Sequence, residues 1–276
     1  MTPSGGFTSL TAGGNRLVRT YNSYLRLDEL LGLQTLASDP NEHDEMLFIV
    51  IHQVYELWFK QVLHEAILLQ RAFEENDRPL ALSTLKRILT IFKTLVSQVD
   101  ILETMTPVSF SSFRHRLDTA SGFQSTQFRE LETILGHRRP GAFFHIPEDS
   151  EARQRLESLQ KVPSVYDSFL RFLSLNGHAI PEDVLGRDPV GPPPEDERVQ
   201  KTLIDIYRNH PPDRDVCERL VDLDEALQEW RYRHVKMVQR TIGVKMGTGG
   251  SPGAKYLETT LFKPLFPDLW TIRASL

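Results

Sequence analysis

The sequence is poor in cysteine and in long apolar runs. Cys217 is the single cysteine among 276 residues, which excludes an intramolecular disulfide, a cysteine-rich zinc site and a CxxCH haem attachment. One thiol in a chain of this length favours a reducing, cytoplasmic location. No apolar run reaches the roughly 18 residues that predict a membrane span, and residues 1–16 lack the apolar core of a signal peptide. We therefore expect a cytoplasmic protein that does not enter a membrane.

Clustered positive charge is also missing. The formal net charge is -5, and no basic cluster is interleaved with aromatic residues, so nucleic acid is not an expected partner. Hydrophobic residues make up 40% of the chain, enough for a sizeable core in one large domain or two small ones.

Strand-like alternation and internal repeats are absent, whereas helical periodicity recurs along the whole chain. The spacing of apolar residues predicts long helices over about 43–75, 79–105 and 213–243. Residues 1–20 are rich in Gly, Ser and Thr and are expected to form a flexible arm. We expect residues 21–276 to form one all-α domain, a bundle of long antiparallel helices.

The stretch 43–64 stands out because apolar residues surround nearly the whole predicted helix, which indicates a buried helix. Polar residues nevertheless recur every four positions, at His52, Glu56, Lys60 and His64, and Phe48 lies one turn before His52. Buried polar groups need partners, so this helix carries either a structural polar network or a site. His52 taken alone fits an ordinary core histidine at least as well as a ligand.

A second histidine lies on the predicted helix 213–243, where Trp230 precedes His234 by one turn. Two histidines on two long helices suit a pocket for a flat, apolar cofactor such as haem, in which one neutral imidazole binds the iron. Other cofactor motifs are absent: there is no Glu-x-x-His pair for a di-iron centre, no HExxH and no P-loop. Among metal cofactors, haem in the core of the bundle therefore fits the pattern best, although either histidine alone is weak evidence for it.

Two further positions are candidates for ligand contacts. Arg114 follows Phe110 and Phe113, and a guanidinium in apolar surroundings needs a carboxylate, either from a protein side chain or from a ligand. Thr248 lies in a glycine-rich segment, 245–255. That segment fits either a loop that closes over a ligand or an ordinary helix C-cap and turn.

Taken together, several stretches resemble the tryptophan 2,3-dioxygenase family, in order from about Tyr21 to Trp270. They are YNSYLRLDELL (21–31), FIVIHQVYELWFKQ (48–61), ASGFQSTQFRELE (120–132), WRYRHVKMVQRTIG (230–243) and GTGGS (247–251). The resemblance implies an all-α homotetramer with haem b, active in the ferrous state. It also implies cleavage of the indole C2–C3 bond of L-tryptophan by O2 to give N-formyl-L-kynurenine, the first step of tryptophan catabolism by the kynurenine pathway.

The resemblance assigns roles to individual residues. His234 would be the axial ligand of the haem iron, and His52 the catalytic distal histidine, which accepts a hydrogen bond from the indole N–H. Phe48 would pack on the indole ring. One departure is Thr119, where the family usually has proline, and it touches none of these roles.

The same resemblance places the amino-acid end of the substrate. Arg114 would pair with the substrate carboxylate, and Thr248 would bind its ammonium group. Tyr21, Tyr24 and Leu25 would complete the pocket of a neighbouring subunit, so the oligomer would be part of the active site.

Three alternatives stay open at this level. One is a haem enzyme of the same fold that acts on a substituted tryptophan or another indole. A second is a non-catalytic haem sensor, which would need neither a carboxylate-binding arginine nor a closing loop. The third is a helical scaffold without a cofactor.

Overall fold

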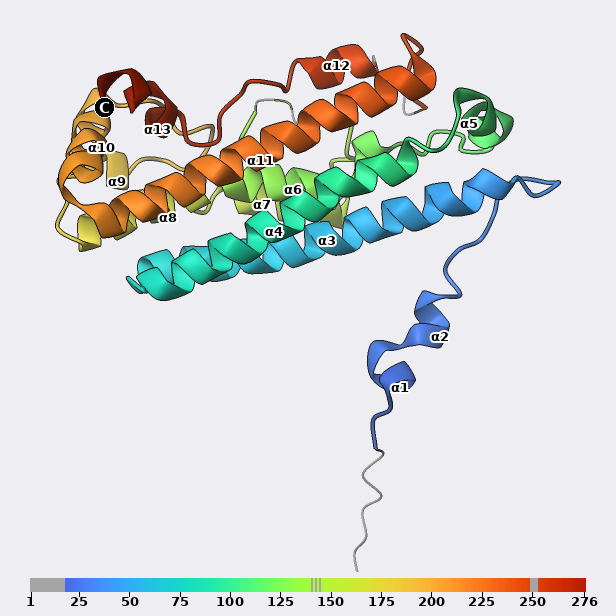
Figure 1. The fold of residues 1–276 in the computed structure, drawn as a ribbon, viewed down its shortest axis with the longest axis horizontal. Helices are drawn as coiled ribbons and strands as arrows, with labels where there is room; N and C mark the ends of the chain where they lie inside the picture. The colour runs from blue at the N-terminus through green and yellow to red at the C-terminus, as the bar shows by residue number, and fades with distance from the viewer. Residues whose placement is uncertain (1–17, 140, 142, 144, 249–252) are drawn as a thin grey trace, which may run out of the picture. The chain divides into compact units, whose positions relative to one another are not determined.

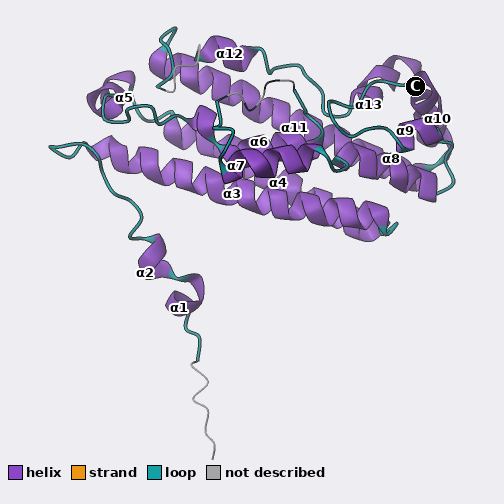
Figure 2. Cartoon of the chain, turned by 180° about the vertical axis from the view of Figure 1, so that it is seen from behind, coloured by secondary structure: helices purple, strands orange, loops and turns teal. Residues whose placement is uncertain are grey.

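The computed structural model describes residues 18–139, 141, 143, 145–248 and 253–276, and within these residues the chain is all-α with no strand. The α-helices are α1 (Tyr21–Leu25), α2 (Leu27–Leu30), α3 (His43–Glu74), α4 (Arg78–Leu102), α5 (Pro107–Arg114), α6 (Thr126–Leu135), α7 (Glu151–Gln160), α8 (Val165–Leu175), α9 (Glu182–Leu185), α10 (Glu197–Asn209), α11 (Pro211–Ile242), α12 (Ala254–Glu258) and α13 (Pro267–Thr271). Two 3₁₀ turns, Gly122–Gln124 and Ile272–Ser275, complete the regular structure. The predicted fold class is confirmed (Figures 1 and 2).

The chain divides into two compact units, of which the first ends at Thr35 and the second covers Leu36–Leu276. The predicted arm, residues 1–20, falls mostly on residues 1–17, which lie outside the described residues. The first unit contains α1 and α2. Arg26 adopts a left-handed conformation with φ 53° and separates the two helices.

Three long helices form the frame of the second unit. In Figure 1, α3 runs opposite to both α4 and α11, as the chain colours show. Neither Gly nor Pro interrupts the 32 residues of α3, and α4 begins where the Asp77 side chain accepts a hydrogen bond from the Leu80 amide at 2.9 Å. The helix α11 starts with two prolines and ends at Gly243, which has φ 62°. These start and stop signals explain why the three predicted ranges are close to the observed ones.

The core fills the space between the long helices and the shorter helices that cover them. Phe73 of α3 packs on Phe169 and Phe172 of α8, with ring centroids 5.9 and 5.4 Å apart. The helix α6 covers α3 nearer its middle, and α12 lies along α11. One side of α3 therefore faces the core along its whole length.

The other side of α3 corrects the expectation of a helix buried all round. Leu57, Lys60 and His64 are exposed in the single chain, so the polar series from His52 to His64 divides between cavity and surface. The apolar residues that suggested complete burial include this exposed face.

No helix in the described part of the chain combines the length and the apolar character needed to span a membrane.

Candidate active site

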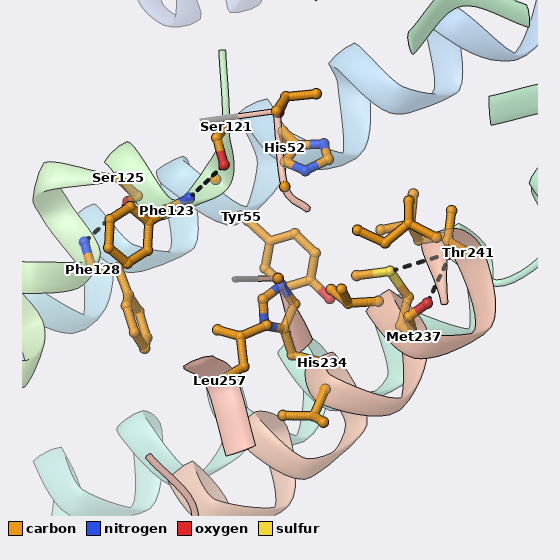
Figure 3. Close-up of a pocket in the computed structure, with 18 of the residues that line it drawn as sticks. His52, Tyr55, Ser121, Phe123, Ser125, Phe128, His234, Met237, Thr241 and Leu257 are labelled. Carbon is orange, nitrogen blue, oxygen red and sulfur yellow. Dashed lines mark hydrogen bonds between the residues drawn. The ribbon is translucent and has the colours of Figure 1, made fainter. Parts of the chain in front are cut away.

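A cavity lies where α3, α4, α5, α6, α11 and α12 meet, and side chains of all six line it. Its volume is about 240 Å³, against the roughly 10–15 Å³ that one buried water needs on the same measure. Figure 3 shows His52 and His234 directed toward this space from α3 and α11, with Tyr55 nearby. Most of the wall is apolar, so the cavity suits a large apolar ligand rather than a single ion or water.

His52 is held in one tautomer by its own helix. Its Nδ1 lies 2.7 Å from the carbonyl oxygen of Phe48, and because that oxygen only accepts, Nδ1 carries the proton. Burial lowers the pKa of His52, so the ring is neutral near pH 7 and Nε2 is left as an acceptor. The site therefore presents a hydrogen-bond acceptor, not a charge, at this position.

His234 is also neutral. Burial, followed by the nearby His52 and Arg129, lowers its pKa to about 4. Its ring stacks on Trp230 with 5.2 Å between centroids and 5° between planes, and no hydrogen bond to its ring nitrogens is found among the described residues. A neutral imidazole with a free nitrogen at the cavity wall is the donor that a haem iron requires.

Aromatic rings form the wall next to His52. Phe48 lies 4.2 Å from the His52 ring, and 5.6 Å from both Phe110 and Phe113 of α5. Tyr55 adds a further ring, and its hydroxyl donates to the Leu95 carbonyl at 2.9 Å. A flat aromatic ligand would meet ring faces and edges on this side of the cavity.

Arg114 and Thr248, which lie 134 positions apart in the sequence, line the same cavity. The Arg114 guanidinium donates to the Met246 carbonyl at 2.5 Å, and the Thr248 hydroxyl donates to the Ala120 carbonyl at 2.5 Å. Arg114 Nε is buried without a hydrogen-bond partner. No protein carboxylate pairs with Arg114 among the described residues, which leaves a carboxylate of a ligand as its natural partner. Residues 249–252 of the glycine-rich segment lie outside the described residues.

A buried ionic cluster at the cavity escaped the sequence analysis. Glu132 of α6 accepts hydrogen bonds from Arg129 at 2.5 Å, from Arg231 at 2.6 Å and from Arg139 at 3.2 Å. Arg129, Glu132 and Arg231 line the cavity, and the Nε atoms of all three arginines are buried without a partner. Three positive charges around one negative charge leave an excess that an anionic group of a ligand would neutralise.

Tyr21, Tyr24 and Leu25 belong to the first unit, where their side chains are exposed. Their predicted contact with a neighbouring subunit's pocket stays a prediction, because a single chain does not contain that contact.

Fold and cavity together define an all-α ligand-binding protein whose apolar site carries two neutral histidines and buried arginines. A model of the family described as tryptophan 2,3-dioxygenase matches residues 8–158 and 198–276. A protein of that name from Herpetosiphon aurantiacus is 56% identical over 257 residues, which cover 93% of this chain and 98% of the relative. The relative from Anaeromyxobacter sp. strain K is 56% identical over 257 residues, 93% of this chain and 96% of its own.

A more distant relative of the same name, from Bacillus thuringiensis, is 41% identical over 260 residues, 93% of this chain and 92% of the relative. The chain belongs to the tryptophan 2,3-dioxygenase family.

Proposed function

We propose that this protein is a haem-dependent dioxygenase that cleaves the indole C2–C3 bond of L-tryptophan with O2 to give N-formyl-L-kynurenine. The observation that carries the proposal is one cavity with an apolar aromatic wall, two neutral histidines and Arg114, an arginine without a carboxylate partner among the described residues. Membership of the tryptophan 2,3-dioxygenase family supports oxidative cleavage of tryptophan as the reaction of this cavity. On this proposal the protein begins the catabolism of tryptophan by the kynurenine pathway.

The residues of the cavity fit haem b. His234 supplies a neutral nitrogen for the iron, and the apolar wall suits the porphyrin. The excess positive charge of Arg129, Arg139 and Arg231 around Glu132 suits the two carboxylates of the cofactor. When bound in the ferrous state, haem supplies the activation of dioxygen, which otherwise reacts slowly with a closed-shell indole.

The chain's own residues bind and orient the substrate. The free Nε2 of His52 accepts a hydrogen bond from the indole N–H, because the Phe48 carbonyl holds the proton of His52 on Nδ1. The ring of Phe48 packs on the indole. With both contacts made, the reacting C2–C3 bond is held in one pose, and positioning of this kind lowers the barrier substantially.

The amino-acid end of the substrate is bound at the opposite end of that pose. Arg114 exchanges its bond to the Met246 carbonyl for the substrate carboxylate, and Thr248 exchanges Ala120 for the ammonium group. Met246 and Thr248 both belong to the segment 245–248. Because both hydrogen bonds are given up, this segment rearranges when substrate binds. His52 orients the indole and is not required to remove a proton.

Assembly completes the site in this proposal. Tyr21, Tyr24 and Leu25 expose apolar surface, which a neighbouring subunit would bury in a homotetramer. Val50 and Leu57 on the outer face of α3 are likewise exposed in the single chain, as expected of a subunit interface. We propose a cytoplasmic homotetramer, in agreement with the single cysteine.

The direct test uses the haem-reconstituted protein, reduced with dithionite. Its absorption spectrum is recorded, and L-tryptophan is then added in air while absorbance is followed at the formylkynurenine band. A Soret band followed by product growth is expected. A Soret band without product would show that L-tryptophan is not the substrate. Turnover of a ring-substituted tryptophan would then identify a haem enzyme of the same fold with that substrate. Absence of any Soret band would refute the proposal.

A further inference from the structure

Glu132 is almost completely enclosed, and its only charged partners in the described part of the chain are arginines. Its side chain is 3% exposed, and it forms ion pairs with Arg129, Arg139 and Arg231. Burial alone would raise the pKa of Glu132, but the three guanidinium groups lower it to about 2. The carboxylate is therefore ionised near pH 7.

The cluster carries a net charge of +2. His137 lies in the field of the same charges, but burial and the charge of Arg231 lower its pKa to about 3, so it is neutral near pH 7. Three guanidinium groups and one carboxylate remain. A net charge of +2 at the cavity matches the two carboxylates of haem b, and without Glu132 the charge would be +3.

The cluster lies beside the proposed iron ligand. Arg231 precedes His234 by one turn on α11, and the guanidinium of Arg129 lies 5.7 Å from the centre of the Phe128 ring. Phe128 contacts Trp230 at 4.9 Å between ring centroids, and Trp230 stacks on His234. Two aromatic rings in contact, Phe128 and Trp230, therefore connect Arg129 to His234, and such apolar material screens charge poorly.

We propose that Glu132 is a positioning residue of the cofactor site, which holds Arg129 and Arg231 at the cavity wall and limits the charge beside the iron to +2. Arg139 contributes a third positive charge from behind Glu132, because it binds the same carboxylate but does not line the cavity. The inference rests on the proposed binding of haem. On this inference, the opposing charges of Glu132 and Arg139 help to set the reduction potential of the iron.

The test compares variants that change this charge in opposite directions. Glu132→Gln removes a negative charge and should raise the Fe(III)/Fe(II) potential, because added positive charge favours the ferrous state. Arg139→Gln should lower it. A unit charge in partly buried surroundings changes such an equilibrium by about tenfold, which is about 59 mV for one electron. The potentials are measured by spectroelectrochemistry on the reconstituted protein.

The double variant Glu132→Gln/Arg139→Gln restores the net charge of +2, so its potential should return toward that of the unsubstituted protein. A purely structural role of Glu132 would give no such return. Glu130→Gln is the matched control, since Glu130 lies on the same helix and pairs with the exposed Arg155 at 3.0 Å. Its potential should stay unchanged.

The inference can still be tested if Glu132→Gln does not fold. Arg139 is partly exposed, at 22%, and Arg139→Gln leaves Glu132 paired with Arg129 and Arg231, so this variant should fold and carries the result by itself. An unchanged or raised potential in Arg139→Gln would overturn the inference. If the unsubstituted protein forms no Soret band with haem, the proposed function fails. A normal Soret band with unresponsive potentials refutes only the role of Glu132.

Discussion

The indole ring of Trp230 lies parallel to the imidazole ring of His234, with 5.2 Å between the ring centroids and 5° between the planes. Both residues belong to α11, one turn apart, so the helix itself sets their spacing. Phe59 and Phe128 also pack on Trp230, with 5.9 and 4.9 Å between ring centroids. His234 is therefore held in one orientation before any ligand arrives, and a preformed ligand loses less entropy on binding.

Replacing His234 with glycine should abolish tight binding of haem. The protein would lose its iron ligand, and the affinity should fall by more than the about 10- to 100-fold that follows loss of an outer-shell partner. Haem titrations followed at the Soret band measure the change. Added imidazole should restore the band in His234→Gly, whereas replacement of the exposed His64 should have no effect. Tight binding in His234→Gly without imidazole would show that another residue is the ligand.

His52→Ala should leave partial activity. The variant loses one neutral hydrogen bond to the indole N–H, and about 0.5–1.5 kcal/mol corresponds to a roughly 2- to 10-fold loss of tryptophan affinity. Steady-state kinetics with L-tryptophan and 1-methyltryptophan separate the contributions, because the methylated indole has no N–H to donate. Complete loss of turnover with unchanged tryptophan affinity would contradict an orienting role.

Arg114→Ala should weaken tryptophan binding by about 10- to 150-fold, the range for a hydrogen bond to a charged group. Tryptamine, which lacks the carboxylate, is the matched ligand, and its affinity should change little. Binding is measured by the shift of the Soret band on addition of each ligand. Equal losses for both ligands would indicate that Arg114 supports the loop through Met246 and does not bind the substrate.

Local patterns were enough to predict the long helices. The apolar spacing of α3, α4 and α11, with Pro and Gly at their ends, fixes each helix to within a few residues. The break between α1 and α2 at Arg26 gives no signal in the sequence, because arginine rarely adopts the left-handed conformation. The exposed face of α3 was not predicted, because the sequence does not show whether an apolar residue such as Leu57 faces the core or solvent.

The site was predictable where a residue stands out from its surroundings. His52 is a polar residue on a largely apolar helix, His234 follows Trp230 by one turn on a second long helix, and the structure brings both to one cavity. Glu132 and Arg231 give no such signal, because charged residues on an amphipathic helix normally face water. They are 99 positions apart in the sequence, and only the packing of α6 on α11 shows that they are buried together.

Acid should destabilise the protein through His137. The pKa of this buried ring is about 3, against about 6.5 in an unfolded chain, so the unfolded state binds more protons below pH 6.5. Stability is full above that pH and falls as the pH drops toward 3, by about 3 kcal/mol between pH 7 and 4. Urea unfolding of the cofactor-free protein at several pH values measures the slope. His137→Asn should flatten it, and an unchanged slope would assign the effect to other groups.

Arg138 should be among the most sensitive positions for stability. It is fully buried and donates to five backbone carbonyls, those of Thr133, Leu159, Gln160, Val162 and Pro189. Arg138→Met leaves several of these without a partner, at about 1–3 kcal/mol each, so a loss of at least about 3 kcal/mol is expected. Arg155→Ala removes an exposed ion pair and should cost less than about 1 kcal/mol. Urea unfolding of both variants makes the comparison, and similar losses would contradict it.

The uninterrupted length of α3 and α11 limits how this protein can vary. Each residue added to a helix rotates the residues beyond it by about 100° about the helix axis. The Glu45 carboxylate accepts a hydrogen bond from the Ser38 amide, which fixes the start of α3. One residue inserted between Glu45 and His52 would therefore turn the imidazole away from the cavity. The connection 178–197 has no such restriction, because a longer loop costs little. Residues 159–197, which include this connection, are also the internal stretch that the family model leaves unmatched. Changes of length can accumulate there without altering the rotational phase of the two histidines.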